Sequence, residues 1–366
     1  MKNIIKHFIL LFLLFILNIG AFAISYPLFQ TSTRILEDAY FAFDSEDYGN
    51  ALKFAEKAKI MRRNEATDCL EVINQALKPL AVQKAGDSIT EILTVLTERD
   101  IFDAIELIEY IIDLKGKAFF HDSITEMLNY LEGKKIYPET SYLIAKIYEL
   151  EGEYELANQY FTEAYSNASA LDISDMKYDI LYDKAILAFN FSNIEDCENS
   201  LLLIVKEDPY FSDLNYNYAI KNSIANKYSP DKVFELYRTD CYRSIPSFFK
   251  LTELYISQNR LEDAFSTALF GVLTSFTRMN EVIENRTSEY FFTGLENFFI
   301  LAMDHSDIST WSIDNGFWRC FYRLGDLGCK LYPESKFGME IFDVISKTAP
   351  EEYWRQISLS KIVKDN

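Results

Sequence analysis

The sequence predicts an all-α protein built from helix hairpins, on three observations. Its 366 residues include only 12 Gly and 8 Pro, the two residues that most disfavour a helix interior. Apolar residues recur at helical spacing through most of the chain, and small residues recur with them at i, i+4 and i+7. The chain is 49% hydrophobic, so it is long and apolar enough to bury a sizeable core.

Residues 1–23 form a segment of their own at the amino terminus. Lys2 and Lys6 precede an unbroken apolar run at 8–17, and a small-x-small sequence ends at Ala23. This order is typical of a secretory signal peptide. An uncleaved amino-terminal anchor is the alternative, because the apolar character comes close to the length that spans a bilayer. We expect cleavage after Ala23 and a periplasmic or secreted protein, with no membrane insertion after cleavage.

The net charge of the chain indicates which classes of partner it can bind. The chain has 36 Lys and Arg against 56 Asp and Glu, a formal net charge of -20. Such a surface repels a polyanion, so we expect no nucleic acid and no anionic membrane surface as partner. A basic partner is compatible with this charge.

After a short lead at 24–33, the first helix hairpin is expected at 34–63. Its first helix is marked by Ala39 and Phe43, and its second helix carries small residues at helical spacing, namely Ala51, Ala55 and Ala58. Small residues allow two helix axes to approach closely.

Further helices are expected at 65–81, 88–97, 100–112 and 119–131. The pentapeptide Asp-Ser-Ile-Thr-Glu occurs twice, at 87–91 and at 122–126. Each copy contains Ser-x-x-Glu, which is the capping box that satisfies free amides at a helix start. The sequence therefore predicts that Ser88 and Ser123 each begin a helix.

The clearest hairpin is the stretch at 138–171. Ala145 and Tyr148 share one face of a first helix, Gly152 supplies a tight turn, and the second helix carries Ala157, Phe161 and Ala164. Small residues on both helices would meet, and the aromatic ring would fill the remaining space.

This hairpin resembles the tetratricopeptide repeat (TPR), which has a small residue in each helix and aromatics at fixed offsets. The pattern returns at 178–211 and 248–271, with a weaker copy at 214–240. The resemblance implies a right-handed superhelical α-solenoid of TPR-like hairpins, with extra helices, over an array at 34–275.

The repeat pattern is lost after residue 275, and residues 276–350 are rich in aromatics. Helices are expected at 291–303, 311–331 and 333–348, followed by a polar tail at 351–366. A solenoid needs an atypical last element to cover its exposed end, so we interpret this region as a carboxy-terminal helical cap. A separate ligand domain is the alternative.

The sequence offers little of the chemistry that enzymes use. The chain after Ala23 contains two histidines, His121 and His305, and lacks phosphate-loop, nucleophile-elbow and zinc-protease motifs. We expect no enzymatic activity, no catalytic residue, no metal and no cofactor. The five cysteines are interpreted as buried thiols, with disulfides as the alternative that export would allow.

In TPR arrays the first helices line a concave groove that binds peptides or proteins. Counting positions two, five, nine and twelve from Pro138, the groove residues would be Glu139, Tyr142, Lys146 and Glu149 in that hairpin. The next clear hairpins place there Asp179, Tyr182, Ile186 and Phe189, and Pro246, Phe249, Glu253 and Ile256. From these sets the candidates for partner binding are Tyr142, Lys146, Tyr182, Phe189 and Phe249. The alternative is that these rings only pack against a neighbouring helix.

The acids around these aromatics favour a protein or peptide partner of basic and apolar character. The resemblance, together with export, implies an interaction scaffold in an envelope or motility assembly, such as the TPR proteins around some periplasmic flagella. The alternative is a ligand carrier or enzyme accessory that uses the aromatic carboxy-terminal region.

Overall fold

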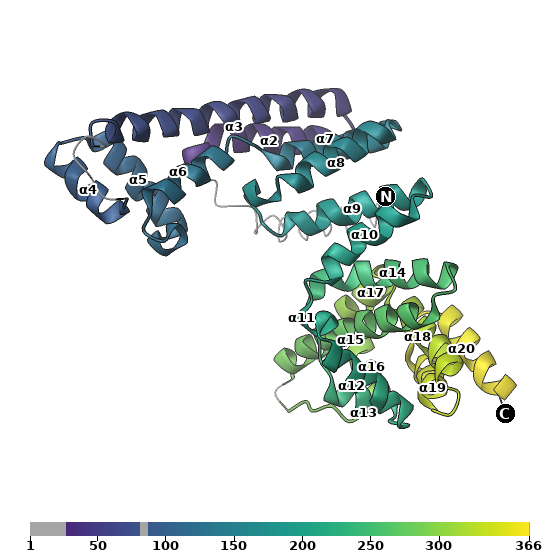
Figure 1. The fold of residues 1–366 in the computed structure, drawn as a ribbon. Coiled ribbons are helices and arrows are strands. Elements are labelled where there is room, and N and C mark those ends of the chain that lie inside the picture. Colours follow the sequence, from purple (N-terminus) through teal and green to yellow (C-terminus); the bar gives the residue numbers. More distant parts are fainter. Residues whose placement is uncertain (1–26, 81–86, 288, 366) are drawn as a thin grey trace. The chain divides into compact units, whose positions relative to one another are not determined.

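The computed structural model describes residues 27–80, 87–287 and 289–365, and the regular elements within these ranges are all helices (Figure 1). The prediction of an all-α protein is confirmed. The expected signal peptide at 1–23 and residues 24–26 of the lead lie outside the described residues. Among the helices that are described, none combines the length and apolar character needed to cross a membrane.

The chain divides into two compact units, residues 1–180 and residues 181–366. The division falls inside helix α9 (Met176–Asn190). It therefore lies within the expected array at 34–275, and each unit is described by itself below.

The first unit opens with η1 (Pro27–Phe29), α2 (Gln30–Asp44) and α3 (Tyr48–Leu77). Helix α2 already begins in the expected lead. Helix α3 is continuous over 30 residues, so the second helix of the first hairpin and the separate helix expected at 65–81 are one element. The physical reason is that residues 50–77 contain no Gly or Pro that would end the helix.

Helices α4 (Ile89–Glu98), α5 (Phe102–Lys115) and α6 (Ile124–Gly133), with η3 (Lys117–Phe120), pack on the carboxy-terminal half of α3. Ser88 and Ser123 are the N-caps of α4 and α6, and the Oγ of each accepts a hydrogen bond from the backbone N–H three residues on. Both predicted helix starts are confirmed.

Helices α7 (Pro138–Glu151) and α8 (Tyr154–Ser166) form the clearest hairpin, and η4 (Ala168–Ala170) follows it. Gly152 ends α7 with a φ of 82°, the left-handed conformation that glycine adopts without strain. Helix α7 packs with α2 and the first half of α3, so the chain returns to its first hairpin after the excursion through α4 to α6.

The second unit starts with the remainder of α9, followed by α10 (Ile194–Val205), α11 (Pro209–Ser212), α12 (Leu214–Ala225) and α13 (Pro230–Leu236). After η5 (Tyr242–Ser244) come α14 (Ile245–Ser257) and α15 (Leu261–Arg286). Helix α15 is buried around most of its circumference, as expected of a helix at the centre of a core. The expected boundary at residue 275 falls inside this helix.

The remaining helices of the second unit are α16 (Leu295–Asp304), α17 (Ser306–Asp314), α18 (Phe317–Leu331), α19 (Phe337–Thr348) and α20 (Glu352–Asp365). The helix expected at 311–331 is interrupted at Gly316, which has a φ of 69°. The expected polar tail is helical over most of its length, because α20 packs on α19 and contributes Trp354 to the core of this unit.

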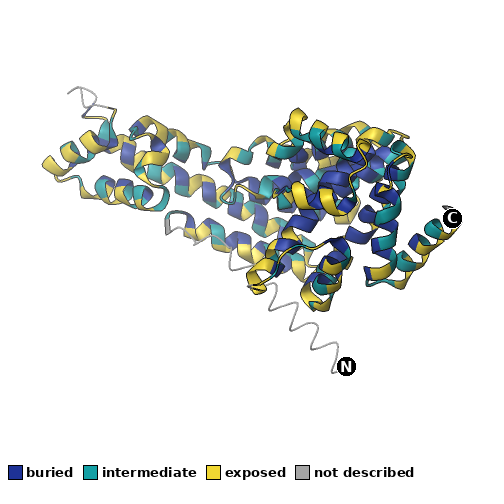
Figure 2. Cartoon of the chain, turned by 90° about the horizontal axis from the view of Figure 1, so that it is seen from below, coloured by how far each residue is buried: buried dark blue, intermediate teal, exposed yellow. Residues whose placement is uncertain are grey.

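Buried and exposed residues alternate around most helices, as Figure 2 shows by its dark blue and yellow bands. The alanines predicted at helix contacts, Ala145, Ala157, Ala185 and Ala264, are all fully buried, which confirms those positions. In the second unit α18 and α19 cross at three glycines, Gly325, Gly328 and Gly338, where the two backbones touch.

Candidate binding cleft in the second unit

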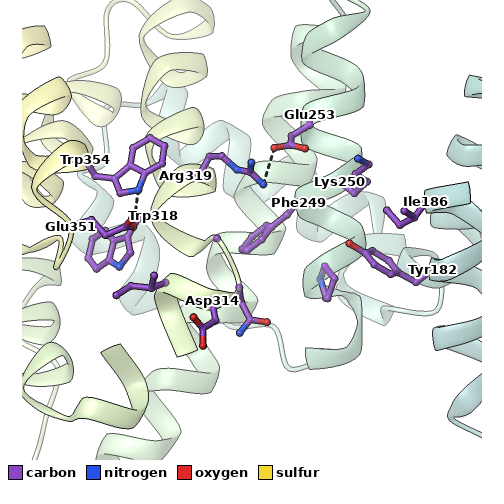
Figure 3. Close-up of a pocket in the computed structure, with 14 residues that line it drawn as sticks. Tyr182, Ile186, Phe249, Lys250, Glu253, Asp314, Trp318, Arg319, Glu351 and Trp354 are labelled. Carbon is purple, nitrogen blue, oxygen red and sulfur yellow. Dashed lines mark hydrogen bonds and ion pairs between the residues drawn. The ribbon is translucent and has the colours of Figure 1, made fainter. Parts of the chain in front are cut away.

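A surface cleft of about 550 Å³ lies in the second unit (Figure 3). Its lining comes from α9, α14, the end of α17 and the turn that follows it, α18, and the start of α20 with the residue before it. The cleft therefore joins the last two clear hairpins of the sequence pattern to the aromatic carboxy-terminal region.

Helices α9 and α14 form one side of the cleft. Helix α9 contributes Tyr182 and Ile186, and α14 contributes Pro246, Phe249 and Glu253. Five of the eight positions that the repeat register assigns to the groove in these two hairpins thus line one cleft. They do so because residues three or four positions apart lie on the same face of each helix.

The other end of the cleft comes from the carboxy-terminal helices. Trp318 is buried there, and its indole Nε1–H donates to Ser312 Oγ at 3.0 Å. Trp354 on α20 is half-buried, and its Nε1–H donates to Glu351 Oε2 at 2.9 Å. Figure 3 shows Glu351, Trp318 and Trp354 at the end of the cleft opposite Tyr182.

The charged groups of the cleft are two cations and three carboxylates, and both cations are already engaged. Arg319 Nη2 lies 2.9 Å from Glu253 Oε1. Lys250 Nζ lies 3.5 Å from the ring centroid of Phe189. The carboxylate of Asp314, at the end of α17, makes no hydrogen bond or ion pair with the described residues. The cleft can therefore offer carboxylate oxygens to a ligand more readily than it can offer cations.

Tyr182 is half-buried at the cleft wall and remains a neutral phenol. Its pKa is raised above the usual value, first by burial and then by the neighbouring carboxylates Asp183 and Glu253. A neutral phenol carries one hydroxyl donor beside its apolar ring, which suits it to a mixed apolar and polar contact.

The five candidates for partner binding have different surroundings. Phe249 is only 8% exposed, and its ring touches Gly271 of α15, so it belongs to the core as well as to the cleft. Phe189 is half-buried against Lys250 beside the cleft. Tyr182 is the candidate with the most free ring surface among those that line the cleft.

Tyr142 and Lys146 lie on α7 in the first unit and do not line this cleft. Tyr142 is 7% exposed, and its ring centroid is 6.0 Å from that of Phe161, so it serves the core of the α7–α8 hairpin. Lys146 is half-buried, with Nζ 5.4 Å from the ring centroid of Tyr142.

Glu139 was expected among the acids at the groove rim, but it is buried. Its Oε1 accepts the backbone N–H of Asp172 at 2.6 Å, and the carboxylate of Asp172 binds Arg62 and Lys134 at 2.8 and 2.7 Å. Burial, and then the charge of Asp172, raise the pKa of Glu139 to about 7. Its role is structural because the loop after α8 folds over it.

Arg62 completes this cluster and is fully buried on α3. Its guanidinium lies between two rings, 4.5 Å from the centroid of Phe29 and 3.7 Å from that of Tyr137. Stacking of this kind compensates part of the cost of removing the cation from water.

The cysteines and histidines form no reactive group in the part of the chain that the structure describes. All five cysteines are described, and they are thiols rather than disulfides. Burial raises the pKa of the Cys197 thiol to about 11, which makes it unreactive. His121 is exposed and His305 is half-buried, and within the described ranges no three His, Cys, Asp or Glu side chains gather as a metal site.

The cleft residues that the sequence pattern did not indicate include Asp314, Arg319, Glu351 and Trp354. The repeat register cannot reach them because they lie outside the repeats. One signal was available for the last two: proline followed by acidic residues and a tryptophan, at 350–354, is a common helix start.

No family model matches the chain. The chain is similar to an uncharacterized protein of Treponema pallidum (strain Nichols), with 23% identity over 327 residues. The alignment covers 88% of this chain and 87% of the relative, so the similarity includes most of both units.

Proposed function

We propose that the chain is an exported interaction scaffold that binds a peptide or protein segment in the cleft of its second unit. The observation that carries this proposal is the meeting of Tyr182, Ile186, Pro246, Phe249 and Glu253 in one cleft. These residues were assigned to a groove from the repeat register alone. A cleft whose residues follow from that register supports a peptide-binding role of the TPR kind.

The partner has basic and apolar character. Aromatic and aliphatic side chains line the cleft, its carboxylates exceed its cations, and the chain has a net charge of -20. This charge also steers a basic partner toward the chain during encounter. On the same ground we propose that nucleic acid is not a partner.

The architecture we propose is a TPR-like α-solenoid with a carboxy-terminal cap. Four hairpins support it, α2–α3, α7–α8, α9–α10 and α14–α15, each with small residues buried at the helix contact. With the amino-terminal signal, we place the protein in the periplasm or outside the cell, in an envelope or motility assembly.

A ligand carrier or enzyme accessory is the second candidate, and one observation favours it. The cleft volume of about 550 Å³ falls within the range of small-molecule sites. Trp318 and Trp354 also bring the aromatic carboxy-terminal region into the cleft.

The test is purification of the tagged chain from the cells that make it, with mass spectrometry for both proteins and small molecules. We compare the wild type with Tyr182→Ala and with Tyr218→Ala as a matched control, since Tyr218 is 72% exposed on α12 and does not line the cleft. A scaffold brings down a protein that is lost with Tyr182→Ala and kept with Tyr218→Ala. A small molecule lost in the same way establishes the carrier instead.

Binding affinity and melting temperature together distinguish Tyr182, a binding anchor, from Phe249, which also belongs to the core. We expect Tyr182→Ala to weaken binding of the identified partner by about 1–3 kcal/mol, the usual range for an interface anchor. Phe249→Ala should weaken binding and also lower the melting temperature, because Phe249 packs on Gly271. If Tyr182→Ala leaves binding unchanged, the cleft is not the partner site.

The proposal also holds that the chain catalyses no reaction of its own. A turnover that is lost in folded His121→Ala or His305→Ala protein would contradict it.

A further inference from the structure

We propose that the segment at 167–175, which joins α8 to α9, is held by a pH-sensitive latch that opens more readily as the pH rises. We call this segment the connector. The latch residues are Glu139, Asp172, Arg62 and Lys134, and all four belong to the first unit. The latch involves neither the cleft of the second unit nor a partner, so it is independent of the proposed function.

Side chains from three neighbouring elements attach the connector to the first unit. Glu139 on α7 accepts the backbone N–H of Asp172 at 2.6 Å. The carboxylate of Asp172 pairs with Arg62 on α3 at 2.8 Å and with Lys134, the C-cap of α6, at 2.7 Å. The Nζ of Lys134 also donates to the carbonyl oxygens of Ala170 and Leu171, at 2.8 and 3.3 Å. The middle of the connector is therefore fixed by these side chains.

The latch is closed to water, and two of its polar atoms are left over. Arg62, Lys134 and Glu139 are each at most 3% exposed. Glu139 Oε2 and Arg62 Nη1 are buried, and neither has a hydrogen-bond partner in the described part of the chain. A neutral carboxylic acid loses little by such burial, whereas a carboxylate loses the hydration of its charge. The closed latch therefore favours the neutral form of Glu139.

The titratable groups that face Glu139 come from neighbouring helices and from the connector, and they are Tyr40 on α2, Arg62, Lys134, Tyr137 at the N-cap of α7 and Asp172. Burial raises the pKa of both phenols, so they stay neutral. The two cations favour an ionised Glu139, but burial and then the charge of Asp172 oppose it. Burial dominates and raises the pKa of Glu139 from 4.5 to about 7.

The direction of the pH effect follows from this difference. When the connector opens, the Glu139 carboxyl reaches water and regains its ordinary pKa of 4.5. The closed latch binds the proton more tightly than the open one. Its stability from this group is therefore fully present below about pH 4.5, falls as the pH rises to about 7, and is level above that. The connector opens more often at pH 8 than at pH 5.

The connector has two neighbours that its opening affects. Ser169 and Ala170 form part of the wall of a separate cleft of about 340 Å³ in the first unit, which is also lined by Phe119, Phe120 and Tyr130. Opening removes this wall. The connector also leads into α9, in which the first unit ends. The pH therefore sets how firmly the first unit holds the segment that leads to the second.

The experiment is hydrogen–deuterium exchange, read by mass spectrometry, on the full chain after signal cleavage from pH 5 to pH 9. Exchange is expressed as a protection factor, which removes the intrinsic effect of pH on the exchange rate. Glu139→Gln removes the titration, and its amide oxygen still accepts the Asp172 N–H. Glu151→Gln is the matched control, since Glu151 is exposed on the same helix. Amides at 51–58 in α3, which carry the buried alanines, report unfolding of the whole unit.

We expect the protection factor of the wild-type connector to fall about ten-fold or more between pH 5 and pH 7.5 and to stay level up to pH 9. Glu151→Gln should follow the wild type, and Glu139→Gln should keep one value throughout. The connector should also be less protected than 51–58 at pH 8, because the latch opens without unfolding of the unit.

Three outcomes would overturn the latch. Identical profiles for Glu139→Gln and the wild type would show that another group controls the connector. Equal protection of the connector and of 51–58 at every pH would show that the connector opens only when the whole unit unfolds. If Glu139→Gln does not fold, the wild type still decides, because a fall that continues above pH 8 would assign the titration to a different residue.

Discussion

Ser88 and Ser123 face each other across an isolated antiparallel bridge, and each caps the helix that it begins. The aspartate that precedes each serine binds side chains of the other turn. Asp122 accepts the hydroxyl of Ser88 at 2.8 Å, and Asp87 accepts the hydroxyl of Thr125 at 2.7 Å. The repeated pentapeptide is therefore one reciprocal structure that joins the starts of α4 and α6.

We predict that Ser88→Ala and Ser123→Ala each lower the free energy of unfolding by about 1 kcal/mol, because each removes an N-cap. Denaturant unfolding of the purified chain measures the change. Thr94→Ala is the control, since Thr94 is exposed within α4 and its hydroxyl bonds only to the carbonyl one turn earlier. Equal effects of Ser88→Ala and Thr94→Ala would show that the caps contribute nothing.

We predict that Glu139→Gln removes a pH dependence of stability. The pKa of Glu139 rises from 4.5 to about 7 on folding, chiefly through burial, so the folded state binds the proton more tightly than the unfolded state. Wild-type stability from this group is then fully present below about pH 4.5, falls as the pH rises to about 7, and is level above that.

Thermal melting from pH 5 to pH 8 tests this. The melting temperature of Glu139→Gln should exceed that of the wild type at pH 8 and approach it at pH 5. Glu334→Gln, at an exposed position, serves as the control. Parallel pH profiles for the wild type and Glu139→Gln would contradict the prediction.

We predict that Gly338→Ala destabilises the second unit by about 1–3 kcal/mol through overpacking between α18 and α19. A Cβ at residue 338 would lie 2.6 Å from the backbone nitrogen of Cys329 and against the carbonyl oxygen of Gly325. Gly49→Ala is the control, because a Cβ there meets nothing within 4 Å, and it should be neutral or slightly stabilising. Denaturant unfolding of both variants measures the two changes in the free energy of unfolding.

We predict that Ala157→Leu overpacks the α7–α8 hairpin at a cost of about 1–3 kcal/mol, since Ala157 is fully buried. Asn158→Leu adds a leucine to the exposed side of the same helix and should change stability by less than about 0.5 kcal/mol. An unchanged melting temperature for Ala157→Leu would mean that the hairpin has space for a larger side chain at residue 157, and it would contradict the prediction.

We predict that the mature protein begins at Ile24, because export should remove residues 1–23. Amino-terminal sequencing of the protein from its own cells checks this, with the fractionation of membranes as a second measurement. A chain that begins at Met1 and extracts with membranes would establish the anchor instead.

The local features of the fold could be predicted because they depend on short spacings. Ser88, Ser123 and Gly152 follow capping and turn rules that act within a few residues. The buried alanines follow from the spacing of one helix face. The continuous α3 could not be predicted in this way. The length of the repeat suggested that a helix ends near residue 63, but no Gly or Pro between residues 50 and 77 ends the helix.

The cleft could be predicted on one side only. Tyr182, Ile186 and Phe249 belong to two copies of one pattern, so a register assigns them to the same face. Glu351 and Trp354 are more than 90 residues further along the chain than Phe249, and no periodicity links them to it. Glu139 was misplaced for a related reason, since its burial depends on a loop that folds back after α8.

The separation of Phe249 and Trp354 by more than 100 residues decides when the cleft can exist. A chain is synthesised from its amino terminus, and its early parts can fold before the late parts are made. The wall with Tyr182 and Phe249 is therefore available before Glu351 and Trp354 have been made. The growing chain has an incomplete cleft until α20 is added, and a message with a stop codon just before Glu351 would yield a protein that lacks this wall permanently.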